Sequence, residues 1–157
     1  MKRLFSAMLI FIAGCGTIQI SGDTKIIELP GMSKNQIYQK AMQWLTYKFV
    51  SGKAVIDYKD PASGRLIAKG TLAIAQPMGS HADVFMVATI DAINGKTKIL
   101  VEPAECAAVA PNGARYPCNA MYITPAGLKE IKIKPEEFTE EYKLYMTGGR
   151  APAWDGK

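Results

Sequence analysis

The feature that most constrains the fold is a series of alternating segments separated by turn residues. Apolar and polar residues alternate over 54–59, 65–75, 84–93 and 96–102, the period of a strand with one buried face. Asp60–Gly64 and Asn94-Gly95 are typical of hairpin turns, residues 76–83 read as a loop, and Pro103 is expected to end the last strand. The pattern predicts four antiparallel strands joined in sequence.

A strand and an amphipathic helix precede these segments. Residues 24–29 read as a strand that the turn dipeptide Pro30-Gly31 ends. Ser33 and Gln36 have the spacing of a capping box, which predicts a helix reaching about Phe49. Its apolar stripe is formed by Ile37, Ala41, Trp44 and Leu45. An aromatic residue on such a stripe is typical of a core, so Trp44 is interpreted as a core residue rather than a ligand platform.

A second helix is predicted near the carboxyl end of the chain. Pro135 is suited to a helix start, and Gly148-Gly149 is expected to end the helix. The resulting order is strand, helix, four strands, helix. This order predicts an α+β fold, an antiparallel sheet of about five strands with helices on one face. We expect one domain over residues 25–147, followed by a flexible tail over 148–157.

The amino-terminal residues have the layout of an export signal. Lys2 and Arg3 precede about ten mostly apolar residues, too few to span a bilayer. The following stretch, Ile12-Ala13-Gly14-Cys15, resembles the lipobox of bacterial lipoproteins. The alternative is an amino-terminal core helix with an incidental cysteine.

The lipobox resemblance implies cleavage between Gly14 and Cys15. It also implies a diacylglyceryl group on the Cys15 thiol and an acyl chain such as palmitate on the new amino terminus. Residues 1–14 are then a signal peptide and 15–24 a lipidated tether that holds the domain at a membrane of the cell envelope, because two or more chains anchor stably. By the same resemblance, Gly16 favours the outer membrane over the inner one.

The net charge argues against nucleic-acid binding. The formal charge of +5 falls to +3 once Lys2 and Arg3 are removed with the signal peptide. Nucleic-acid binding needs a concentrated basic patch, which this balance does not provide. We therefore expect no nucleic-acid partner.

The two cysteines that remain beside Cys15 predict a disulfide. Cysteines of an exported chain meet an oxidising compartment, and Cys106 and Cys118 form an even pair. Pro111-Asn112-Gly113 lies between them and can reverse the chain. A redox or metal pair is the alternative, but the eleven-residue gap lacks C-x-x-C spacing. The stapled hairpin is expected to protrude from the core and to contact a partner in the envelope.

The stretch "ELPGMSKNQIYQKAMQWLTYKFVSGKAVIDYKDPASGRLIAKGTL" resembles a bacterial domain family of unknown function with a TATA-binding-protein-like fold. The resemblance covers about residues 28–101 and rests on four features, which are Gly-Met-Ser-Lys before the helix, Trp44 and Phe49 within it, Ile56-x-Tyr58-x-Asp60, and Gly64-x-Leu66-Ile67-x-x-Gly70. It implies the fold and no activity. DNA binding would be an analogy from fold alone.

Candidate catalytic residues are few. His81 is the single histidine and lies beside Ser80 and Asp83 in the predicted loop, where three neighbours rarely form a triad. Asp57 and Asp60 are interpreted as solvated hairpin residues. Glu136, Glu137, Glu140 and Glu141 suit the first turns of the predicted last helix. No metal-ligand spacing or phosphate-binding glycine loop occurs, so no metal, cofactor or catalytic residue is predicted.

These observations predict a lipid-anchored envelope protein that is a non-catalytic binding or structural module. One alternative is an inhibitory or exclusion lipoprotein that blocks a receptor by protein contact. Another is an envelope hydrolase acting on peptidoglycan or lipid. A contiguous exposed apolar patch would favour the binding and inhibitory functions. A concave pocket with convergent ionisable groups would favour the enzyme.

Overall fold

The structure, a computed structural model, describes residues 20–48 and 55–149. Gly14, Cys15, Gly16 and Phe49 lie outside the described residues, as do the predicted signal peptide, the tether up to residue 19 and the tail from residue 150. The elements in chain order are β1 (Asp23–Glu28), α1 (Lys34–Lys48), β2 (Val55–Asp60), β3 (Arg65–Ala75), the short 3₁₀ turn η1 (Pro77–Gly79), β4 (His81–Ile93), β5 (Lys96–Val109), β6 (Arg115–Pro117) and α2 (Pro125–Met146).

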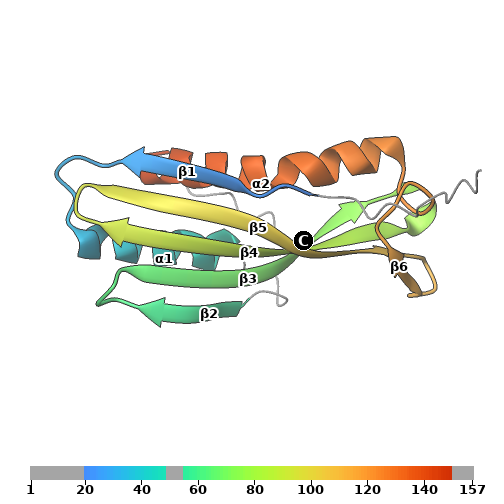
Figure 1. The fold of residues 1–157 in the computed structure, drawn as a ribbon, viewed down its shortest axis with the longest axis horizontal. Coiled ribbons are helices and arrows are strands. Elements are labelled where there is room, and N and C mark those ends of the chain that lie inside the picture. Colours follow the sequence, from blue (N-terminus) through green and yellow to red (C-terminus); the bar gives the residue numbers. More distant parts are fainter. Residues whose placement is uncertain (1–19, 49–54, 150–157) are drawn as a thin grey trace, which may run out of the picture.

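The strands form one antiparallel sheet in the order β1-β5-β4-β3-β2, and β6 pairs with the end of β5. Both helices lie on the same face of this sheet (Figure 1). Alternate residues of the central strands, such as Ala88 and Ile90 of β4, point into the layer between sheet and helices and are fully buried. The predicted α+β architecture with helices on one face is confirmed.

The local signals at α1 and at the tight turns act as expected. Ser33 N donates to Gln36 Oε1 at 2.9 Å and Gln36 N donates to Ser33 Oγ at 3.3 Å, the two bonds of a capping box. Gly64 has a φ of +79°, and a Cβ there would lie 2.2 Å from Ala92 O. Only glycine therefore fits this turn between β2 and β3.

Two of the central strands are longer than the sequence predicts. β4 begins at His81 rather than at residue 84, so His81 and Asp83 belong to a strand and the loop prediction for them is wrong. β5 continues through Pro103 to Val109. The register between β4 and β5 shifts at this point, because Met86 lies opposite Pro103 whereas Phe85 lies opposite Glu105. A bulge of this kind accommodates a residue without an N–H, which explains why Pro103 does not end the strand.

Helix α2 begins ten residues before the predicted start. Thr124 is its N-cap, with Thr124 Oγ1 accepting a bond from Gly127 N at 3.2 Å, and Pro135 lies inside the helix. Pro135 costs a backbone hydrogen bond. However, it lies on the buried stripe with Ile131, Phe138 and Tyr142, and the packing of this stripe against the core offsets the local cost.

The helices meet at an aromatic cluster over the sheet. The Trp44 ring of α1 packs edge-on against Phe138 and Tyr142 of α2, each at a centroid distance of 5.0 Å. Thr97 Oγ1 of β5 donates to Asp91 O at 3.1 Å and accepts from the Tyr142 hydroxyl at 2.9 Å. Burial raises the pKa of Tyr142, so this hydroxyl stays a donor. The cluster joins both helices to the sheet.

Trp44→Ala should be among the most destabilising single substitutions in this domain. Trp44 is fully buried, so its truncation should lower the free energy of unfolding by about 3–5 kcal/mol. Urea denaturation followed by far-UV circular dichroism measures the loss. The control Leu144→Ala, at a position 60% exposed on α2, should change stability by less than about 0.5 kcal/mol. Equal effects of the two substitutions would contradict the assignment of Trp44 to the core.

Candidate functional site

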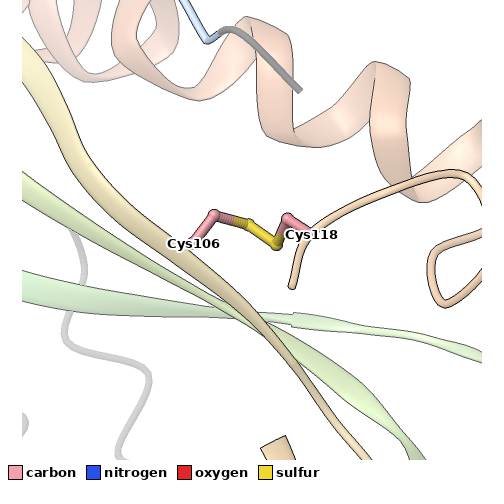
Figure 2. Close-up of a disulfide and its surroundings, with 2 residues drawn as sticks. All are labelled: Cys106 and Cys118. Carbon is pink, nitrogen blue, oxygen red and sulfur yellow. A yellow bond between two sulfur atoms is a disulfide. The ribbon is translucent and has the colours of Figure 1, made fainter. Parts of the chain in front are cut away.

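One end of the sheet carries the predicted disulfide. Cys106 of β5 is bonded to Cys118, which follows β6, with a Cα–Cα distance of 5.5 Å (Figure 2). β6 pairs with β5 through Ala107↔Pro117, Ala108↔Tyr116 and Val109↔Arg115. The hairpin and its disulfide are therefore confirmed. We call residues 76–81 and 106–124 the stapled end.

The stapled end is tied to the start of α2 by one side chain. Gln76 Oε1, in the β3–β4 connection, accepts bonds from Thr124 N at 3.2 Å and from Thr124 Oγ1 at 2.9 Å. Thr124 in turn caps α2. The amide of Gln76 thus connects the tip of the β3–β4 hairpin to α2, the helix that follows the β5–β6 hairpin. Sequence reasoning missed this link because it placed the helix start at Pro135.

Large apolar side chains are exposed at the stapled end. Met78 is 93% exposed and Met121 76% exposed. Tyr116 and Tyr122 stack with ring centroids 4.5 Å apart and an interplanar angle of 17°, and each keeps about two fifths of its surface exposed. Met78 adopts a φ of +59°, a left-handed conformation that a residue with a side chain rarely adopts. This end therefore presents apolar and aromatic side chains to the outside.

The residues around His81 are arranged as part of the sheet. Asp83 Oδ2 accepts a bond from Arg115 Nη1 at 2.9 Å, and Asp83 Oδ1 lies 3.4 Å from His81 Nε2. The Asp83 carboxylate is almost fully buried and the Arg115 guanidinium covers it. Ser80 Oγ donates instead to Pro77 O at 2.8 Å. The Ser80 hydroxyl is thus bonded within its own turn. It is not bonded to His81, so Ser80 and His81 do not form a nucleophile–base pair in this structure.

An open groove of about 850 Å³ runs along α1, between β2 and the end of α2. It is lined by Asn35, Gln36, Gln39, Lys40, Met42, Gln43, Thr46, Ile56, Lys59 and Tyr145. The Tyr145 hydroxyl donates to Gln43 Oε1 at 3.2 Å, and Lys40 Nζ donates to Met146 O at 3.0 Å.

This groove offers amide groups rather than an acid–base pair. Burial raises the pKa of Tyr145, which keeps its hydroxyl protonated. Among the described residues, no carboxylate lines the groove. Its lining combines amide groups with the ammonium groups of Lys40 and Lys59, and it holds neither the carboxylate nor the histidine that most often serves in general acid–base catalysis.

Most of the acidic residues singled out in the sequence form ion pairs. Asp57 Oδ2 lies 2.7 Å from Lys69 Nζ, and Asp60 Oδ1 accepts from Ala62 N at 2.9 Å in the β2–β3 turn. The prediction that the glutamates occupy the first turns of the last helix is wrong, because they lie in the middle of α2. Three of them instead pair with lysines, in the pairs Lys134–Glu137, Lys25–Glu140 and Lys48–Glu141.

Two kinds of feature are absent from the part of the chain that the structure describes. Within 20–48 and 55–149, no group of three or more His, Cys, Asp or Glu residues could hold a metal ion. No helix in this part of the chain is both long and apolar enough to cross a membrane.

Comparison with known proteins identifies the fold. Residues 24–88 match the family model described as "Domain of unknown function (DUF4468) with TBP-like fold". The crystal structure of a DUF4468 family protein from Bacteroides ovatus ATCC 8483 superposes with a TM-score of 0.60 and 16% identity, covering 88% of this chain and 94% of that chain. No curated protein matches the chain.

A second crystal structure supports the same conclusion. A TBP-like protein from Parabacteroides distasonis ATCC 8503 superposes with a TM-score of 0.57 and 10% identity, covering 82% of this chain and 94% of that chain. At such identities the likeness concerns the fold alone. The predicted TBP-like fold is confirmed, and the predicted family resemblance has its counterpart in the match over residues 24–88.

Reduction of the Cys106–Cys118 bond should destabilise the domain. Opening a loop of this size should lower the free energy of unfolding by about 3 kcal/mol in the chain-entropy account. Urea denaturation with and without dithiothreitol measures the difference. The double variant Cys106→Ser/Cys118→Ser should be equally destabilised and insensitive to dithiothreitol. Two free thiols on these positions in non-reduced protein from the envelope would contradict the prediction.

Proposed function

We propose that this protein is a lipid-anchored, non-catalytic module of the bacterial cell envelope, held at the membrane by Cys15 and contacting its partner through the stapled end. The observation that carries the proposal is the Cys106–Cys118 disulfide. Disulfides persist in oxidising compartments, outside the cytoplasm. The chain has three cysteines, so the one left over is the cysteine of the lipobox-like stretch.

The arrangement of side chains supports a contact role over catalysis. Binding modules expose contiguous apolar surface, and Met78, Met121 and the Tyr116–Tyr122 pair lie at one end of the sheet. The hydrolase alternative needs a nucleophile beside a base. Ser80 is bonded to a backbone carbonyl in its own turn, which favours the contact role.

The sheet face opposite the helices supports the exclusion of nucleic acid. Arg65 of β3 lies 2.6 Å from Asp91 of β4, and Lys69 lies 2.7 Å from Asp57. Each of these cations already faces a carboxylate, so they supply little of the unpaired positive charge that phosphate binding requires. A TBP-like fold does not by itself imply binding to DNA, because function resides in sites rather than folds.

Cys15→Ser should abolish lipidation. The thiol is the acceptor of the diacylglyceryl group, so the variant should remain uncleaved or become soluble, and its intact mass should lack the lipid. Fractionation of intact envelopes and mass spectrometry measure both. The matched control Cys118→Ser, which removes a different cysteine, should stay lipidated and membrane-bound. A Cys15→Ser variant with the mass and membrane distribution of the parent would refute the anchor.

Serine-directed chemistry tests the hydrolase alternative. The folded protein, incubated with a fluorophosphonate probe, should gain no adduct, because Ser80 Oγ is held by Pro77 O and lacks a base. Intact-mass spectrometry before and after incubation reads the result. Stoichiometric labelling of Ser80 that is lost in the His81→Ala variant would support the hydrolase alternative.

A further inference from the structure

We propose that the partner of the stapled end is the lipid bilayer itself, so that the domain lies with this end docked on the membrane that holds its anchor. The inference rests on the proposed function, since it takes the anchor at Cys15 as given. It adds the orientation of the domain and the chemistry of the surface that it contacts.

The stapled end is nearly free of charge. Charged residues make up 21% of the chain, yet none occurs in residues 70–82 and only Arg115 occurs in residues 106–128. Arg115 is paired with Asp83, and His81 is the one further group that can gain a charge besides the tyrosines. Charged groups are expensive to move out of water, so an uncharged end suits contact with lipid.

The exposed side chains are of the kinds that favour a membrane interface. Tyr116 and Tyr122 combine an apolar ring with a polar hydroxyl, and such side chains concentrate at the level of the lipid headgroups. Met78 and Met121 are unbranched apolar side chains that project into solvent. These four residues give the stapled end an apolar surface with hydroxyl groups, and lysine or glutamate side chains do not interrupt it.

The direction of β1 leads the chain from Asp23 toward the stapled end. β1 runs antiparallel to β5, with Asp23 opposite Val101 and Glu28 opposite Lys96. Residues 20–22 therefore lead toward the stapled end (Figure 1), and Ile20 packs against the core on this path.

The length of the tether limits where the lipid can lie. Cys15 lies five positions before Ile20, a stretch that spans at most about 18 Å. β1 extends about 17 Å from Asp23 to Glu28, where the turns at the opposite end of the sheet begin. Ile20 lies three residues before Asp23 and is therefore farther still from those turns. A lipid on Cys15 thus reaches the stapled end more readily than the opposite end.

The opposite end of the molecule is charged. Ile93 is exposed there, but Lys96 lies opposite it on β5, and Glu28 lies opposite Lys96 on β1. Its exposed apolar residues are therefore interspersed with ion-forming side chains. The contrast between the two ends favours a single docked orientation.

The test places a tryptophan at each end of the lipidated full-length chain. Met121→Trp reports the stapled end and Ile93→Trp the opposite end, both at exposed positions. The purified lipidated proteins are incorporated into phosphatidylethanolamine–phosphatidylglycerol vesicles that contain brominated lipid. The quenching of each variant is compared with that of the parent protein, because Trp44 and Trp154 also contribute to the emission. Bromine on the acyl chains should quench the Met121→Trp emission by about half, because docked side chains reach the headgroup–acyl boundary, and should leave Ile93→Trp unchanged.

The outcomes separate the two proposals. Intact mass and flotation with the vesicles report lipidation and anchoring, and their failure would refute the proposed function. A protein that floats while Met121→Trp is quenched no more than Ile93→Trp would overturn the docking proposal alone. The charged variant Met78→Asp/Met121→Asp, combined with a Tyr122→Trp reporter, should float normally and lose at least about half of that reporter's quenching. Unchanged quenching in this variant would also contradict docking.

Discussion

The antiparallel pairing of β4 with β5 is the interaction on which the rest of the structure depends. These strands have 13 and 14 residues and pair along almost their whole length, from the Asn94-Gly95 turn to Val109. β3 is added to one side, β1 and β6 to the other, and both helices pack on the same face. The hairpin extends beyond β1 to the end of the sheet where α2 begins.

Local signals predicted much of this fold because their physics is local. The Ser33–Gln36 capping box and the Asn94-Gly95 turn each involve a few neighbouring residues, and the structure contains both. The disulfide was predictable because compartment, cysteine number and an intervening turn all agreed. These features need no knowledge of distant parts of the chain.

The errors occur where tertiary packing overrides a local rule. Pro103 was expected to end a strand and Pro135 to begin a helix, but a bulge accommodates the first and a buried stripe retains the second. The same limit hid the character of the stapled end. Tyr116 and Tyr122 lie six residues apart with a disulfide-bonded cysteine between them, and only the folded chain shows that their rings stack.

The antiparallel register of β1 with β5 has a mechanical consequence for a tethered domain. In a protein anchored at Cys15 as proposed, tension would reach β1 at Asp23 and act along the axis of the strand. The hydrogen bonds of an antiparallel pair are perpendicular to the strands, and such a load therefore shears the β1–β5 bonds together rather than peeling them one by one. All six residue pairs from Asp23↔Val101 to Glu28↔Lys96 share the force. The strand nearest the anchor thus acts as a mechanical clamp.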